Sequence, residues 1–456
     1  MNIRIWIVLA FFFCRGAQAS GLDDPFSTEN MTAASPCSFT YDGHGALSLA
    51  DVVERALCNN PQTRAAWANA RVQAAQVGVA ESAYLPTLNA NIASSETRNS
   101  SILDRLQGAS SSFFSQTGTT LSLSYLLYDF GARNANLENA RQTLVALNET
   151  RDATIQSVFL SAVQAYYGLF ANQASVDSAL LSEKSSLEGL NAASTRRKIG
   201  TATLADELQA KTAYQQAVLN RVTAQGNEKT AEGVLANTMG MDADHPLEIL
   251  PPGISPDEHF ERDLKRLIDE AKRARPDLKA AEAQLAAAKA SVDAAAASGM
   301  PTITLNVGQN YTHSSIYDPY RSTSFGVTVN MPLFTGFNTT YQIRAAQAQV
   351  EASSASRDKI AMQVSLDVWK AYQTLVTATD ALKSTSVLLQ SATESEKLQM
   401  GRYKAGVGLI TDLLTAEAAL ANARQQRVQA IYNWQMDKAA LAQAVGVLTE
   451  IPKKAE

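Results

Sequence analysis

The sequence is poor in the residues that catalysis or cofactor binding would need. Charged residues make up only 18% of the 456 positions, and the formal net charge of −5 provides no basic surface field for nucleic acid. The four histidines lack any metal-ligand spacing, and no phosphate-binding glycine loop occurs. These histidines are His44, His245, His259 and His313. The absences argue against an enzyme, a metal or cofactor site and a nucleic-acid-binding protein.

Long apolar runs are also scarce, and the clearest one lies at the N-terminus. Arg4 supplies a positive charge, residues 5–13 are apolar, and Ala17-Gln18-Ala19 forms a small-residue cleavage site. The apolar run is about half as long as a membrane-spanning helix needs. We therefore expect residues 1–19 to be a signal peptide that directs the chain into a Gram-negative envelope. An uncleaved membrane anchor is the alternative.

Cysteine is rare as well. Cleavage of residues 1–19 would remove Cys14 and leave Cys37 and Cys58. An even pair in an oxidising compartment predicts a disulfide. That bond would attach the N-terminal tail to the first helix and stabilise the fold by roughly 3 kcal/mol. Two free thiols are the alternative.

An internal duplication organises the rest of the chain. Asn60-Pro61 and Leu85-Pro86 recur 215 residues later as Arg275-Pro276 and Met300-Pro301. Further along, the matching residues lie 206 residues apart because one connecting loop is longer. These matches are Ala165-Tyr166 with Ala371-Tyr372, Gly200 with Gly406, Asp206 with Asp412, and Gly240 with Gly446.

The duplication divides the mature chain into five parts. They are an N-terminal tail (20–46), a first repeat (47–240), an inter-repeat linker (241–270), a second repeat (271–447) and a C-terminal tail (448–456). Each repeat is expected to contain a helix, two strands and a helical hairpin.

Proline is missing from two long stretches. None occurs between Pro86 and Pro246 or between Pro332 and Pro452, and an interior proline costs a helix about 3 kcal/mol. Small and apolar residues recur there at coiled-coil spacing. We predict antiparallel helical hairpins at about 131–199 with 203–239 and at about 338–404 with 409–445. A bundle of shorter helices is the alternative, but it would need more helix breakers.

Four segments have a different period. Around residues 88–92, 121–125, 303–308 and 325–331, apolar residues alternate with Asn, Ser, Thr or Gly. This pattern predicts half-buried strands of about 8–11 residues, long enough to cross a membrane at a tilt. A soluble sheet lying on the helices is the alternative. Four strands are too few to close a membrane barrel. An unclosed sheet would leave unpaired strand edges in lipid, so two or three copies of the chain would have to share one pore.

This pattern resembles the TolC family of outer-membrane factors over roughly residues 45–448. The matching motifs are Leu49-Ala50-Asp51 through Ala56-Leu57, Asn60-Pro61, Leu85-Pro86, Pro332-Leu333-Phe334, and Tyr403 followed by Gly406, Asp412, Leu414 and Ala416. Cys37 together with Cys58-Asn59-Asn60-Pro61 is similar to the branch that contains type I secretion channels.

The resemblance implies a mainly α fold with membrane β-structure. Each chain would carry four transmembrane strands and long antiparallel coiled-coil helices. Three chains would form a homotrimer, whose 12-strand β-barrel in the outer-membrane lipid continues into an α-helical barrel in the periplasm. The implied partners are a periplasmic adaptor (a membrane fusion protein) and an inner-membrane pump of the ABC or RND type.

The resemblance also implies roles for residues at the tunnel entrance. Asp412 matches an entrance aspartate, which three chains would turn into a carboxylate ring that attracts cations. Asp206 and Tyr403 match residues that tie neighbouring hairpins shut. The chain departs from the family pattern at Thr415, where a second entrance aspartate is usual, and at Gly408, where an arginine is usual. Solvated surface aspartates are the alternative.

The two hairpin turns match the sites where family members meet the adaptor. These turns are Gly200, Thr201 and Ala202 in the first repeat and Gly406, Val407, Gly408 and Leu409 in the second. A purely structural role in chain reversal is equally compatible with the glycines.

The resulting hypothesis is a passive exit duct of a tripartite efflux or type I secretion system. A periplasmic coiled-coil adaptor or scaffold without a pore is the alternative.

Overall fold

The computed structural model describes residues 24–32, 46–102, 109–244, 247–253 and 263–447. The predicted signal peptide (1–19), Cys37 and the C-terminal tail (448–456) lie outside these residues, so the predicted disulfide with Cys58 stays a prediction.

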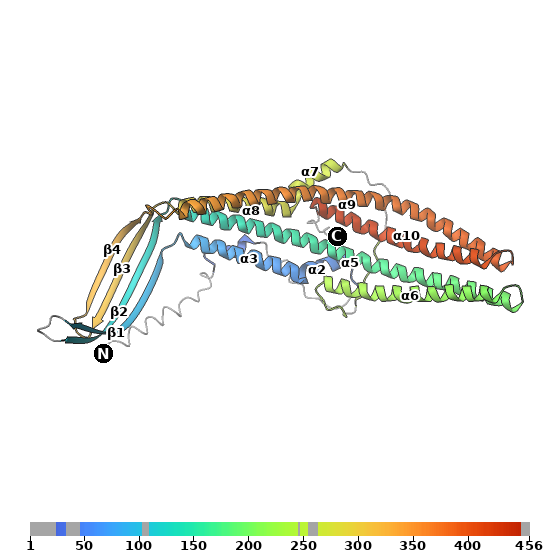
Figure 1. The fold of residues 1–456 in the computed structure, drawn as a ribbon, viewed down its shortest axis with the longest axis horizontal. Helices are drawn as coiled ribbons and strands as arrows, with labels where there is room; N and C mark the ends of the chain where they lie inside the picture. Colours follow the sequence, from blue (N-terminus) through green and yellow to red (C-terminus); the bar gives the residue numbers. More distant parts are fainter. Residues whose placement is uncertain (1–23, 33–45, 103–108, 245–246, 254–262, 448–456) are drawn as a thin grey trace. The chain divides into compact units, whose positions relative to one another are not determined.

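The chain runs twice through the same succession of elements (Figure 1). The 3-10 helix η1 (Thr28–Met31) precedes the repeats. The first repeat contains α2 (Leu49–Asn59), α3 (Pro61–Ser82), β1 (Thr87–Ile102), β2 (Ala109–Tyr128), α5 (Ala132–Lys198) and α6 (Leu204–Thr238). The second succession begins with α7 (Leu264–Ala274), whose first residues lie in the range predicted as the linker. It continues with α8 (Pro276–Ala297), β3 (Thr302–Ser314), β4 (Tyr320–Asn330), α9 (Asn338–Lys404) and α10 (Ile410–Val445). The predicted fold of long helical hairpins and four strands is confirmed.

The long helices follow from the proline-free stretches. α5 and α9 have 67 residues each, while α6 has 35 and α10 has 36. Their ends lie within one or two residues of the predicted bounds. In the part of the chain that the structure describes, no helix is both long enough and apolar enough to cross a membrane.

The strands form one antiparallel sheet in the order β1-β2-β3-β4. The predicted strand length was wrong for three of them, because β1 has 16 residues, β2 has 20 and β3 has 13. The added residues of β1 and β2, at 93–102 and 109–120, are rich in Ser and Thr and lack apolar alternation. Backbone pairing between the two strands continues without that alternation, since Ile102 still pairs with Ala109.

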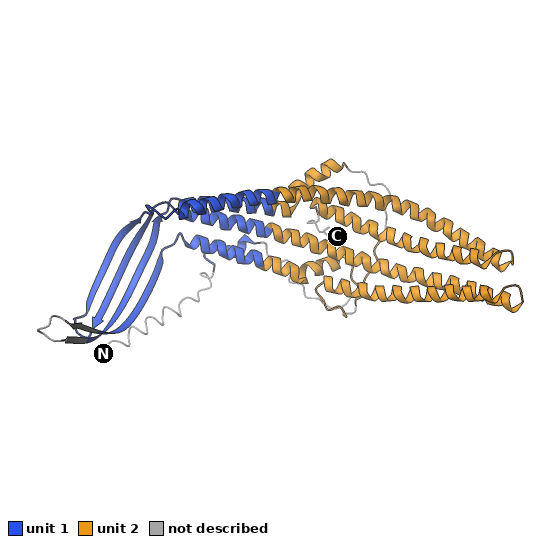
Figure 2. Ribbon diagram, viewed as in Figure 1, with its two compact units in different colours: residues 1–33, 69–148, 280–357 blue, residues 34–68, 149–279, 358–456 orange. Residues whose placement is uncertain are grey.

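The residues pack into two compact units, and each unit draws on both repeats (Figure 2). The first unit includes the sheet and residues 69–148 and 280–357. Its buried core joins α3 to α5 through Ala74, Val77, Leu137, Ala140 and Leu144. The second unit includes residues 149–279 and 358–456, which contain the hairpin ends of the long helices.

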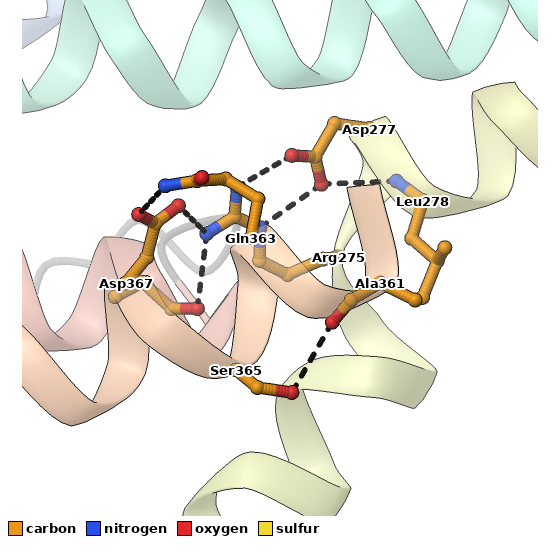
Figure 3. Close-up of polar contacts among 8 residues, drawn as sticks. Arg275, Asp277, Leu278, Ala361, Gln363, Ser365 and Asp367 are labelled. Atoms are coloured by element: carbon orange, nitrogen blue, oxygen red, sulfur yellow. Dashed lines mark hydrogen bonds and ion pairs between the residues drawn. The ribbon is translucent and has the colours of Figure 1, made fainter. Parts of the chain in front are cut away.

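Within the second unit, both repeats anchor the C-terminal end of their last helix in the same way. The Asn60 side chain donates to the Thr238 carbonyl at 3.1 Å, and Arg275 Nη1 donates to the Ala444 carbonyl at 3.5 Å. Arg275 also contacts Asp277 and Asp367, and Gln363 donates to Asp367 (Figure 3). A helix leaves its last carbonyls without partners, and these side chains supply donors to one such carbonyl near the end of α6 and one near the end of α10.

Candidate functional site

The sheet has one apolar and one polar face, and both are continuous across all four strands. Leu88 pairs with Leu123, which pairs with Val307, which pairs with Phe325. The adjacent row on the other face is Asn89, Ser122, Gly308 and Ser324. Because successive residues of a strand point to opposite faces, the register collects the apolar side chains on one side of the sheet.

The apolar face is uncovered in the single chain. The side chain of Ile92 is 74% exposed and that of Phe325 is 75% exposed. Val327 and Val329 on β4 are exposed as well. β1 and β4 are the edges of the sheet, so each has one side without a neighbouring strand in the described residues. Such a sheet is unsuited to water on its apolar face and incomplete at both edges.

The two hairpin turns have the same backbone geometry. Gly200 has φ +78° and Gly406 has φ +86°, both in the left-handed region. Thr201 N–H donates to the Arg196 carbonyl at 2.9 Å, and Val407 N–H donates to the Arg402 carbonyl at 3.1 Å. These bonds close the last turn of α5 and α9 in a glycine-terminated motif.

The predicted adaptor-contact residues lie in these turns, mostly on the surface. Thr201, Val407 and Leu409 are exposed, and Ala202 is half-buried. Gly408 is held against its own helix, because a Cβ there would lie 3.0 Å from the Tyr403 nitrogen. A larger residue at this position would therefore require the neighbouring backbone to shift by a few tenths of an ångström.

The two equivalent aspartates, Asp206 and Asp412, differ in the hydrogen bonds that their side chains make. Asp206 completes a capping box at the start of α6: its carboxylate accepts from Thr203 N–H at 2.9 Å, and its own N–H donates to Thr203 Oγ1 at 3.2 Å. In α10 the N-cap position holds Leu409, which has no capping side chain. Asp412 is exposed and has no ion pair with any described residue. Thr415 is also exposed and donates to the Thr411 carbonyl at 2.8 Å.

Tyr403 lies at a buried contact between the hairpins. Its ring packs in a cluster that draws on all four long helices through Ala193, Ala210, Met400, Ile410 and Leu413. Arg196 from α5 donates to the Tyr403 carbonyl at 3.1 Å, and its guanidinium carbon lies 4.6 Å from the ring centroid. The Tyr403 hydroxyl has no hydrogen-bond partner among the described residues.

The predicted partners Asp206 and Tyr403 therefore lie close together without a direct hydrogen bond. Burial raises the pKa of Tyr403, the Arg196 charge opposes that rise, and the Asp206 charge adds to it. At this position Arg196 makes the polar contact between the hairpins, through its hydrogen bond to the Tyr403 carbonyl.

Glu417 is a buried acid between α5 and α10. Its side chain accepts from Ser186 Oγ at 3.2 Å, while its Oε1 has no partner among the described residues. A Cβ at Gly189 would lie 2.8 Å from that oxygen, so the glycine leaves room for the carboxyl group. Burial raises the pKa of Glu417 to about 7; the Ser186 hydrogen bond opposes the rise, and the charges of Glu396 and Glu188 add to it.

Sequence reasoning did not single out Arg196 or Glu417. Glu417 lies beside Leu413, Ala416 and Leu420 among the buried packing positions of α10. An acid among such positions can be recognised in the sequence as a candidate for a buried polar contact. No comparable signal marks Arg196, whose partner is 207 residues away. Over the described ranges, no group of three or more His, Cys, Asp or Glu side chains is arranged to hold a metal ion.

Known proteins share this architecture and part of the sequence. The model of the family described as outer membrane efflux protein matches residues 52–241 and 267–447. Protein CyaE of Bordetella pertussis is 30% identical over 451 residues, which cover 97% of this chain and 93% of that protein. Alkaline protease secretion protein AprF of Pseudomonas aeruginosa is 25% identical over 420 residues, covering 89% of this chain and 85% of that protein.

A solved structure shares the fold. The outer membrane protein VceC of Vibrio cholerae aligns with a TM-score of 0.77 at 21% identity, covering 87% of this chain and 96% of that one. The resemblance to TolC-like channels that the motifs indicated is confirmed. The chain belongs to the outer membrane efflux protein family.

Proposed function

We propose that this protein is a passive exit duct in the outer membrane, built from three copies of the chain. Each copy contributes four strands to a common twelve-stranded wall, and the long helices continue the duct into the periplasm. The protein carries no chemistry of its own, so the energy for export comes from its partners.

The observation that supports this function best is the two-faced sheet. One face carries rows such as Leu88, Leu123, Val307 and Phe325, which suit lipid, while the opposite face carries Asn, Ser and Thr, which suit water. Lipid cannot satisfy the backbone groups of an open edge. β1 of one copy therefore pairs with β4 of the next until the wall closes.

The hairpin ends form the entrance of the duct. Asp412 is exposed and forms no ion pair with the described part of the chain. It repeats around the axis as a carboxylate ring that favours cations. Thr415 leaves this ring with fewer charges than two aspartates per chain would give. Asp206 and Tyr403 belong to the closed-state contact, in which Arg196 supplies the hydrogen bond. The turn residues from Gly200 to Ala202 and from Gly406 to Leu409, which are mostly exposed, receive the adaptor.

The partners follow from the same assignment. A periplasmic adaptor and an inner-membrane pump, of the ABC or RND type, complete the export machine. The name of AprF, a secretion protein, supports a secreted protein as one class of cargo. The description of the family as efflux proteins supports small molecules as the other. A periplasmic adaptor without a pore is not favoured, because the matched family is one of outer-membrane channels.

Membrane fractionation tests the proposal. The protein should separate with the outer membrane and should run as an oligomer that heat converts to monomer. A soluble periplasmic monomer, stable without detergent, would rule out the duct and revive the adaptor alternative.

A further inference from the structure

A buried acid interrupts the apolar packing between α5 and α10 near the hairpin ends. The buried positions of α10 at this level are Leu413, Ala416, Glu417 and Leu420. Leu413 belongs to the cluster that includes Tyr403, so Glu417 lies about one helical turn from the contact that joins the hairpins. Burying a polar group costs stability unless hydrogen bonds compensate for the lost water. The chain thus keeps an ionisable group where an apolar residue would pack without that cost.

The carboxyl group of Glu417 has fewer hydrogen bonds than its ionised form needs. Ser186 Oγ on α5 donates to Glu417 Oε2 at 3.2 Å, whereas Oε1 has no partner among the described residues. A Cβ at Gly189 would lie 2.8 Å from Oε1, so the glycine leaves the space that this oxygen fills. A buried carboxylate is stabilised by two or three donors, and one hydroxyl suits the neutral form better. Burial accordingly raises the pKa of Glu417 to about 7.

The charged groups near Glu417 come from three helices and do not neutralise it. Glu188 on α5 and Glu396 on α9 both add to the rise in its pKa. The nearby cations are directed at these two acids, because Lys404 lies 3.8 Å from Glu188 and the charge of Glu396 acts on Arg424 of α10. An ionised Glu417 would therefore be repelled by two acids, with a single hydroxyl donor to stabilise it.

The acid, its hydroxyl donor and the glycine occur together in only one of the two equivalent places. The shift of 206 residues between the repeats carries Ser186 to Ala392, Gly189 to Ser395, and Glu417 back to Lys211. Because the other copy keeps none of the three residues, the duplication does not account for their combination. We call Ser186, Gly189 and Glu417 the carboxyl clasp.

We propose that the carboxyl clasp is a proton-operated switch, which holds α5 and α10 together while Glu417 is neutral and releases them when it ionises. A neutral carboxyl group stays between the helices, whereas a carboxylate moves toward water and separates α10 from Ser186. The adjacent turn of α10 carries Leu413 and the Tyr403 contact, so the loosening reaches the hairpin ends. The inference rests on the proposed duct and adds regulation of its entrance, which acid closes and a rise of pH opens.

Single-channel recording at a series of pH values tests the switch. The open fraction of the parent should rise several-fold between about pH 5.5 and about pH 8.5, a range that spans the Glu417 pKa of about 7. Glu417→Gln keeps an acceptor for Ser186 and carries no charge, so its open fraction should stay low throughout. Glu394→Gln removes an exposed acid of α9 as a control and should keep the response of the parent.

Asp412 is a second acid near the hairpin ends, and a separate variant distinguishes it from Glu417. Asp412→Ala should change ion selectivity while the open fraction still rises with pH. A rise that is lost in Asp412→Ala, or one that persists in Glu417→Gln, would overturn the switch and leave the proposed duct intact.

A substitution without a charge change tests the space beside the carboxyl group. Gly189→Ala places a methyl group against Glu417 Oε1 and displaces the carboxyl group toward water. The rise in open fraction should therefore move to lower pH, although alanine by itself favours the helix. An unchanged midpoint, or one at higher pH, would contradict the clasp.

Distances between α5 and α10 separate a failure of the switch from a failure of the duct. Spin labels at Lys184→Cys and Asn422→Cys, both exposed, report the spacing of the two helices without requiring conduction. The spacing should widen from about pH 5.5 to about pH 8.5 and should stay constant when Glu417→Gln is added. A constant spacing in both proteins would overturn the switch. If the protein conducts at no pH, the duct fails, and these distances still decide whether the contact responds to protons.

Discussion

Glu417 is an acid at a helix-packing position, 7% exposed, and its pKa is raised to about 7 by burial. A carboxyl whose pKa is raised by folding contributes its full stability below its ordinary pKa of 4.5, and that contribution is lost as the pH rises through about 7. The contact between α5 and α10 is therefore expected to weaken as Glu417 ionises.

The variant Glu417→Gln should remove this pH dependence. It keeps an acceptor for Ser186 but has no charge to bury, so we expect it to be more stable than the parent at pH 8 by on the order of 2 kcal/mol and nearly equal to it at pH 4. Thermal unfolding at the two pH values measures the difference. Glu394→Gln, an exposed acid on α9, is the control and should change little. A gain at pH 4 as large as that at pH 8 would contradict the account.

The equivalent residues Asp206 and Asp412 should respond differently to substitution. Asp412→Ala should lower the cation preference of the channel and weaken its block by multivalent cations. The side chain makes no hydrogen bond or ion pair with the described residues, and in the proposed duct it supplies charge at the entrance. Asp206→Asn should instead lower stability by about 0.5–1 kcal/mol through the capping box of α6. Reversal potentials across a salt gradient and thermal unfolding measure the two effects. Unchanged ion selectivity in Asp412→Ala would remove the residue from the entrance ring.

At the scale of an element, the hairpin turn of α9 and α10 depends on the left-handed glycine at 406. Gly406→Ala meets no neighbouring atom within 4 Å but must hold φ near +86°, so we expect it to cost about 1 kcal/mol. Gly401→Ala is the matched control inside α9, with equally open space, and should stabilise the helix by about 0.5–1 kcal/mol. Thermal unfolding of the two variants decides the point; equal shifts would show that backbone conformation is not what matters at position 406.

The elements could be predicted from the sequence to different degrees. The long helices could be placed within one or two residues, because proline is absent between Pro86 and Pro246 and glycine marks each reversal. The outer parts of β1 and β2 could not, because their Ser- and Thr-rich residues pair through the backbone and leave no apolar pattern.

Residues of the candidate site could be predicted only where they recur in both repeats or belong to a family motif. Asp412 and the turn glycines stand out because each has an equivalent 206 residues away. Arg196 and Glu417 act through partners on other helices, Tyr403 and Ser186. Spacing along a single helix does not report such partners. The roles of Asp206, Tyr403 and Thr415, and the division of the chain at 241–270, stay predictions.

At the scale of the whole molecule, the single chain has two kinds of surface that lack a packing partner. The sheet ends in two edges, β1 and β4. The helices present uncovered faces on α6 and α9, including Leu219 and Met362. In the proposed duct, copies that meet head to tail would supply neighbours for both kinds of surface.

Single-channel recording in planar lipid bilayers tests this account most directly. The purified oligomer should insert and give long-lived steps of uniform conductance that prefer cations, and heat-dissociated monomer should give none. If an intact oligomer of the chain adds no conductance to the bilayer, its copies do not enclose a water-filled passage and the account is wrong.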